Sequence, residues 1–98
     1  MKHGIYSVYD SAIEAYLRPF PAPADGAAIR SFQDEVLTPD SPMNQHPEHY
    51  SLFKVSTFDD ASGEMQKELP IVLAKAHEIM AHAKNQIINI EEKRQGAQ

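Results

Sequence analysis

The sequence predicts a small α+β domain, in which a mostly antiparallel sheet carries helices on one face in the order β-β-α-β-β-α. Two observations support this prediction. The first two thirds of the chain contain short segments rich in β-branched and aromatic residues, separated by turn-forming residues. The last third contains a long run of helix-forming residues that has no internal glycine or proline.

The first two strands are predicted at residues 5–9 and 13–20. Most residues of the first segment are β-branched or aromatic, which is typical of strands. In the second segment apolar and polar residues alternate, which indicates a strand with one wetter face. Pro19 and Pro21 confine this strand to a sheet edge or end it early, because proline cannot donate a hydrogen bond to a neighbouring strand.

A helix is predicted after these prolines. Asp25 is the expected N-cap, because its carboxylate can accept hydrogen bonds from the free backbone N–H groups of the first turn. Ala28, Phe32 and Val36 follow the helical repeat. Pro39 ends the helix, since the residue before a proline avoids the helical conformation.

A second strand pair is predicted beyond this helix. Residues 38–47 contain three prolines and predict a surface loop. Pro47 predicts an extended entry into a third strand at residues 50–58. The acidic and small residues that end at Gly63 then predict a tight hairpin turn, followed by a short return strand at residues 64–67.

The end of the chain predicts one long helix from Pro70, a residue that suits the first turn of a helix. A helix of about 24 residues spans ~36 Å, whereas a typical strand spans only ~17–20 Å. We therefore expect the distal half to overhang its own sheet and to join a homo-oligomer, most simply a dimer. The alternative is a helix that folds back over its own sheet. Its apolar seam consists of Leu73, Ala76, Met80, Ala83, Ile87 and Ile90.

Composition sets further expectations for the 98-residue chain. Residues 1–68 are expected to form the α+β core domain, and residues 69–98 the long helix, a packing or oligomerisation element. The absence of cysteine excludes disulfides, thiol nucleophiles and thiolate metal sites. No apolar run reaches membrane-spanning length and no signal peptide is visible, so the expected location is the cytoplasm of the cell.

The charge distribution disfavours strong, autonomous binding to DNA. The net charge is -5. Residues 1–63 hold four basic and nine acidic side chains, whereas residues 64–98 hold five of each. Proteins that grip phosphates show a basic stripe, because neutralising the nucleic-acid backbone drives their non-specific affinity. No such stripe is visible in the sequence.

No motif predicts an enzyme, a metal site or a cofactor. The residues His46, Glu48 and His49 contain metal-ligating types, but Pro47 forbids the helix on which such a pair is usually presented. A loop that positions the following strand is the better interpretation. The sequence also lacks a glycine-rich phosphate loop and a nucleophile elbow.

Aromatic residues on the predicted strands are the remaining candidates for a binding site. A sheet face that displays aromatic rings beside arginine or lysine can stack the bases of single-stranded nucleic acid. The alternative is that most of these rings pack in the core. Tyr16 and Arg18 are the better candidates, because alternation places them opposite the apolar residues of their segment. The full candidate set is Tyr16, Arg18, Phe20 and Lys54.

Four segments of the chain resemble a known protein family. They are residues 7–11 (SVYDS), 14–20 (EAYLRPF), 46–53 (HPEHYSLF) and 58–63 (FDDASG). Together they make the first 66 residues similar to the small nonstructural protein of gokushovirus-type microviruses, which are single-stranded DNA bacteriophages. His49 stands where that family is expected to carry an acidic residue.

The resemblance implies a nonstructural accessory protein of viral DNA replication and packaging. Proteins of this family are often labelled DNA-binding, and the implied partners are the replication initiator or procapsid proteins in the bacterial cytoplasm. Two function hypotheses follow. The first is an adaptor that works by protein–protein contact and touches single-stranded DNA weakly. The second is a direct single-stranded DNA-binding protein that uses the aromatic residues of the sheet.

Overall fold

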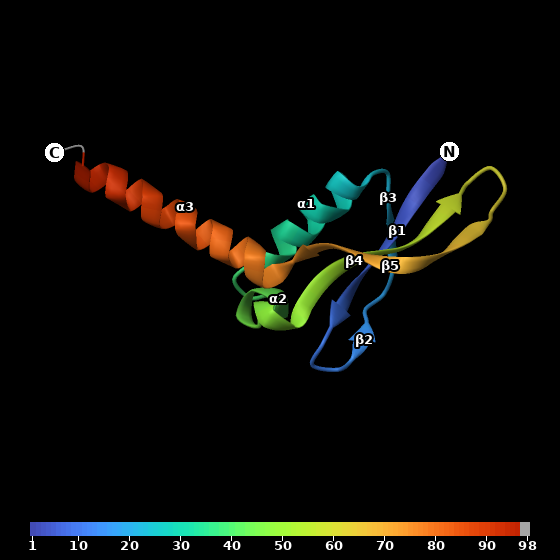
Figure 1. Cartoon of the computed structure of the whole chain (residues 1–98), viewed down its shortest axis with the longest axis horizontal. Coiled ribbons are helices and arrows are strands. Elements are labelled where there is room, and N and C mark those ends of the chain that lie inside the picture. The colour runs from blue at the N-terminus through green and yellow to red at the C-terminus, as the bar shows by residue number, and fades with distance from the viewer. Residues whose placement is uncertain (97–98) are drawn as a thin grey trace.

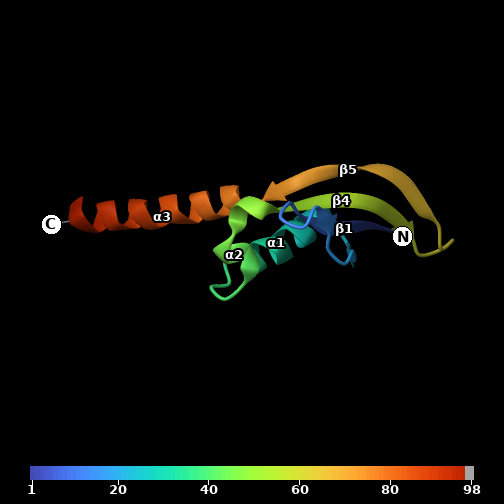
Figure 2. The ribbon, with the colours of Figure 1, turned by 90° about the horizontal axis from the view of Figure 1, so that it is seen from below.

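A computed structural model describes the backbone of residues 1–96 and the side chains of residues 1–87. Its centre is an antiparallel sheet with the strand order β2-β1-β4-β5, and a short strand, β3, that also pairs with β1. Helices α1 and α2 lie on the same side of this sheet, and α3 projects away from it (Figures 1 and 2). The predicted α+β class and antiparallel sheet are confirmed. The predicted element order is wrong, because an extra strand and extra short helices are present.

Strand β1 (Lys2–Asp10) lies in the interior of the sheet and has two partners on its outer side. These partners are β2 (Ala15–Tyr16) and β3 (Phe20–Ala22), so the single strand predicted at residues 13–20 is wrong. The segment between them contains Pro19, which has no N–H group to donate to β1. The prediction that this segment lies at a sheet edge is confirmed.

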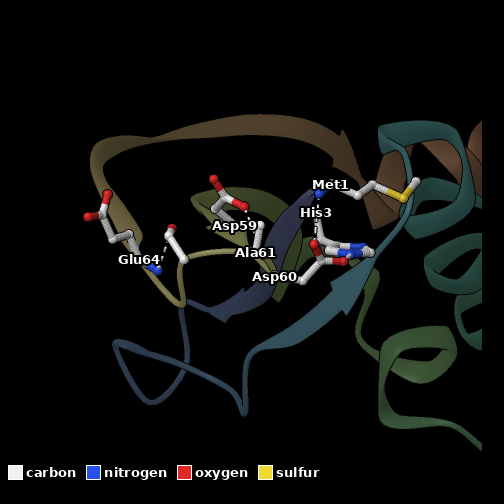
Figure 3. Close-up of polar contacts among 7 residues, drawn as sticks. Met1, His3, Asp59, Asp60, Ala61 and Glu64 are labelled. Carbon is white, nitrogen blue, oxygen red and sulfur yellow. Dashed lines mark hydrogen bonds and ion pairs between the residues drawn. The ribbon is translucent and has the colours of Figure 1, made fainter.

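Strands β4 (Tyr50–Asp59) and β5 (Met65–Lys75) form the long hairpin on the other side of β1. Its turn is closed by a hydrogen bond from the Gly63 N–H to the carbonyl of Asp59 (2.7 Å), and Gly63 has a φ of 77°. Asp59 Oδ1 accepts from the Ala61 N–H, and Ser62 Oγ accepts from the Glu64 N–H (Figure 3). The predicted hairpin turn, with its positive-φ glycine, is confirmed.

Pro70 lies inside β5, so the predicted start of a helix at this residue is wrong. Ile71, Val72 and Leu73 follow it, and such residues pair well with a neighbouring strand. Pro70 is tolerated because β5 is an edge strand that pairs only with β4. The register also slips between Lys54 and Ser56 of β4, so that residues 68–70 of β5 bulge outward.

The turn of this hairpin also contacts the start of β1. The amino group of Met1 donates to Asp60 Oδ1 (2.7 Å), and His3 Nε2 lies 2.8 Å from Asp60 Oδ2 (Figure 3). The hydrogen bond from the amino group, followed by that of His3, lowers the pKa of the Asp60 carboxyl. These contacts attach the turn to the neighbouring strand.

Helix α1 (Asp25–Val36) covers one face of the sheet. The N-cap is Ala24, and the Asp25 carboxylate accepts a hydrogen bond from the Tyr6 hydroxyl (2.6 Å) instead of capping the helix. The prediction of Asp25 as the N-cap is therefore wrong by one residue. The predicted helical repeat is confirmed, because its three apolar residues are buried. With the sheet and α3 they form a core of Tyr6, Val8, Ala22, Ala28, Phe32, Val36, Leu52 and Ala76.

The segment predicted as a loop contains two short helical elements. Helix α2 (Pro42–Gln45) begins at Ser41, whose hydroxyl accepts from the Met43 N–H (3.1 Å). The 3-10 helix η1 (Pro47–His49) leads directly into β4, so the extended entry predicted at Pro47 is instead a single tight turn.

Helix α3 (Ala76–Gly96) begins where β5 ends, and it extends the molecule to 62 × 31 × 21 Å (Figure 2). The residues of the predicted seam belong to two elements, β5 and α3, and differ in how deeply they are buried. Leu73 belongs to β5, Ala76 is fully buried in the core, and Met80 and Ala83 are half-buried. Ile87 is 57% exposed, whereas the side chain of Ile90 lies outside the described residues.

Candidate nucleic-acid interface

Three aromatic rings cluster on the face of the sheet that points away from α1. The ring centroids of Tyr9 and Tyr16 are 4.9 Å apart, those of Tyr16 and Phe53 5.5 Å, and those of Tyr9 and Phe53 6.3 Å. The two contacts of Phe53 are edge-to-face, an arrangement that the ring quadrupoles favour. We call these three residues the aromatic cluster.

The strand register explains why the cluster forms on this face. Successive side chains of a strand point to opposite faces. Val8 and Leu52 point into the core, so the next residues along the two strands, Tyr9 and Phe53, point outward. Tyr16 pairs with Tyr9 across the β1–β2 hairpin and therefore shares its face.

The tight β1–β2 turn brings Tyr16 back over β1. Glu14 has a φ of 53° in this turn, a left-handed conformation that is uncommon for a residue other than glycine. Asp10 Oδ1 accepts a hydrogen bond from the Ala12 N–H (2.9 Å) and fixes the start of the turn. Tyr16 remains 45% exposed, so part of this residue is accessible to a ligand.

Arg18 is an exposed cation close to the cluster along the chain. It follows Tyr16 by two residues, in the connection to β3, and its side chain is exposed. Val72, the cross-strand partner of Phe53 in β5, is 44% exposed and continues the apolar surface. The open face thus offers three rings, an apolar extension and a nearby guanidinium group.

The other two predicted candidates lie on the helix-covered face. The Phe20 ring packs 5.9 Å from the ring of Tyr6, and with Val8 and Phe32 it lines a mostly apolar pocket of about 230 Å³. Lys54 Nζ lies 3.7 Å from Asp25 Oδ1. The structure therefore places Tyr16 on the open face and Phe20 and Lys54 on the other, and Arg18 is exposed in the connection between β2 and β3.

Sequence reasoning identified Tyr16 but did not select Tyr9 and Phe53 as its partners. The signal was available in part, because alternation along each strand separates them from Val8 and Leu52. The missing information was the register between three strands, which decides that these rings meet.

The segment around His49 forms a polar contact beside the β1–β2 turn. His49 Nδ1 lies 3.1 Å from Ser11 Oγ, and its Nε2 lies 3.5 Å from Glu48 Oε1. His46 Nδ1 lies 4.0 Å from the same oxygen. Within the part of the chain that the structure describes, no group of three or more histidine, cysteine, aspartate or glutamate side chains is arranged to hold a metal ion.

A comparison with curated proteins found no match, and neither did a comparison with solved structures. None of the helices within the described residues is long and apolar enough to cross a membrane. A scan against family models matched the one described as phage ORF5 protein over residues 3–79. That match covers the whole sheet, α1, α2 and the first turn of α3. The chain therefore belongs to the phage ORF5 protein family.

Proposed function

We propose that this phage protein is a nonstructural accessory factor of viral DNA replication and packaging that works mainly through protein–protein contact. In this proposal it also touches single-stranded DNA weakly, through the aromatic cluster and Arg18. The phage is of the gokushovirus type, as the sequence resemblance implies. The partners are the replication initiator or procapsid proteins, in the cytoplasm of the bacterial host.

The observation that carries the nucleic-acid part of the proposal is the exposed cluster on the open face. Stacking on an aromatic ring is tolerant of sequence, because every base has a π-face. Tyr16 is 45% exposed, and its ring makes a tilted contact with Tyr9 and an edge contact with Phe53. A ring held in this way loses little freedom when a base stacks on it.

The charge of the molecule supports weak rather than strong contact. The chain carries 14 acidic and nine basic side chains. One of its basic groups, Lys54, lies beside Asp25, and the turn next to Tyr16 carries Glu14. Arg18 can neutralise about one phosphate, so binding should depend only shallowly on salt.

Exposed apolar side chains on the edge strand support the protein–protein part. Leu69 is 86% exposed, Ile71 57% and Met65 60%. An edge strand can add a strand from another protein through its free backbone groups, and its side chains then select the partner. The bulge at residues 68–70 interrupts pairing with β4 and carries the exposed Leu69, and the regular stretches of β5 on either side carry Met65 and Ile71.

No catalytic step and no cofactor belong to this proposal. The function requires only binding surfaces, namely the aromatic cluster on the open face and the exposed side chains of β5. Both are formed by residues within the region that matches the family model.

The test is a titration of fluorescently labelled single-stranded oligothymidine with the protein over a series of salt concentrations. For one or two phosphate contacts, the slope of log affinity against log salt should be about -0.7 to -1.4. The double variant Tyr16→Ala, Arg18→Ala should lower the affinity about tenfold or more, because a stacked base and a phosphate contact are both lost.

A matched control is the variant Arg30→Ala. It also removes one exposed arginine, but from α1, on the far side of the sheet. The control should bind like the unaltered protein. Equal affinity of the Tyr16 and Arg18 variant and the unaltered protein would remove the aromatic cluster from the proposal.

The second candidate function is direct, strong binding of single-stranded DNA. The three-ring cluster favours it, since several stacking positions on one face can bind successive bases. It requires additional phosphate contacts, and the same titration then gives a slope steeper than about -3. The shallow slope expected above would exclude it.

A further inference from the structure

A groove runs between α1 and the proximal half of α3 and has a volume of about 540 Å³. One wall is α1, with Ile29, Gln33 and Leu37, and the other wall is α3, with Ile79, His82 and Ala83. The end of β5 forms the floor with Leu73 and Ala74. The groove lies on the helix side of the molecule, away from the aromatic cluster.

An apolar row along α3 continues the wall of this groove towards the distal end of the helix. Ile79, Ala83 and Ile87 are four residues apart, so they lie on one stripe of the helix. Ile79 and Ala83 are half-buried against the groove, whereas Ile87 is 57% exposed. At the end of α1, Leu37 is 48% exposed. Two apolar side chains on opposite walls are therefore left open to solvent.

We propose that the groove between α1 and α3 is filled by α3 of a second copy of this chain, in an antiparallel, two-fold symmetric dimer centred near Ala83. A two-fold contact is self-complementary, so the same surface must act as groove and as insert. Helix α3 meets this condition, because it forms one wall of the groove and also projects beyond it (Figure 1).

The arrangement pairs isoleucine with isoleucine on either side of a small central residue. With the axis at Ala83, Ile79 of one chain faces Ile87 of the other, and the two Ala83 residues face each other. A small residue at the centre lets two helices approach to the short end of the usual 8–10 Å interaxial distance. The exposed Ile87 would then reach the partner's groove, near its Leu37 and Ile79.

The charge distribution makes this position the least repulsive one for a second copy. Each chain carries a net charge of -5, so two copies repel each other over most of their surfaces. The groove is an exception, because its lining contains one lysine, Lys75, and one glutamate, Glu78. A contact made there brings together two surfaces whose formal charges cancel.

Sedimentation equilibrium at micromolar concentration tests the dimer. The expected mass is twice the 11.0 kDa of the chain. Ile87→Asp should give a monomer, because it places a charge in the apolar contact. Ile13→Asp is the matched control, since Ile13 is 62% exposed in the β1–β2 turn and distant from the groove. A monomeric unaltered protein, or an Ile87→Asp variant that remains a dimer, overturns the proposal.

Engineered cysteines test the direction and the centre of the contact, and the chain has no cysteine of its own to interfere. Under mild oxidation Ala83→Cys should crosslink to itself, because a disulfide needs Cβ atoms ~4 Å apart. An equal mixture of Ile79→Cys and Ile87→Cys chains should form the mixed dimer. Self-crosslinking of Ile87→Cys without the mixed product would show a parallel pair and overturn the proposed geometry. These dimer experiments contain no DNA. A negative result in them therefore rejects the dimer without rejecting the proposed contact with single-stranded DNA, and the reverse also holds.

Discussion

The Tyr6 side chain links the sheet to the start of α1. It is 1% exposed, its ring passes over the backbone of Gly4, and its hydroxyl donates to Asp25. A side chain at residue 4 would collide with that ring, so only glycine permits this close approach. Sequence alone predicted the strand that contains Tyr6 but not this contact, because the partners lie 19 residues apart.

Burial first, and then the hydrogen bond to Asp25, raises the pKa of Tyr6 to about 12. The folded state therefore favours the neutral phenol. This contribution to stability is complete below the unfolded pKa of about 10 and is lost as the pH rises towards 12.

Tyr6→Phe should lower the free energy of unfolding by about 1.5 kcal/mol at pH 8, because a hydrogen bond to a charged group is lost. The difference between the two proteins should shrink as the pH rises from 10 to 12, since the phenylalanine variant cannot ionise at this position. Urea unfolding at several pH values measures both effects. A difference that stays constant up to pH 12 would show that Tyr6 does not titrate as described.

At the scale of the elements, local sequence predicted those whose signal is contained within a few residues. The repeat of Ala28, Phe32 and Val36 and the turn at Gly63 are of this kind. The segment after Pro70 is not, because its residues suit a helix start or an edge strand equally. The segment forms a strand because Ile71 and Val72 pair with β4. This pairing depends on residues far away in the sequence.

The β4–β5 turn and α1 give a matched pair of glycine substitutions. Gly63→Ala should lower the free energy of unfolding by about 1 kcal/mol, because its φ of 77° is unfavourable for a residue with a Cβ atom. Gly26→Ala should raise it by about 0.5–1 kcal/mol, since Gly26 lies in the first turn of a helix with open space around it. Chemical denaturation of both variants measures these changes. Equal effects of the two substitutions would contradict the hairpin geometry.

At the scale of the whole molecule, the structure separates two exposed surfaces. The aromatic cluster lies on the open face of the sheet, and the groove between α1 and α3 lies on the helix side. The family match ends at residue 79, so it includes the cluster and stops within the first turn of α3. This division explains why the sequence resemblance gave expectations for the sheet but not for the projecting helix.

Net charge was predictable from the sequence, but its placement around the site was not. Lys54 illustrates the difference, because it belongs to the same strand as Phe53 and yet points to Asp25 on the opposite face. Among the four side chains predicted to bind nucleic acid is Tyr16. Alternation within its own segment was enough to predict that it lies on the more exposed face. Positions on separate strands required the register of the sheet.

We propose that the open face of the sheet contacts single-stranded DNA weakly, in addition to the protein–protein contacts of the molecule. An NMR titration of isotope-labelled protein with unlabelled oligothymidine tests it most directly, because the shifted resonances locate the contact. The account predicts progressive shifts at Tyr9, Tyr16, Arg18 and Phe53, with α1 from Asp25 to Val36 unchanged. Shifts confined to α1, or no shifts at millimolar oligonucleotide, would contradict it.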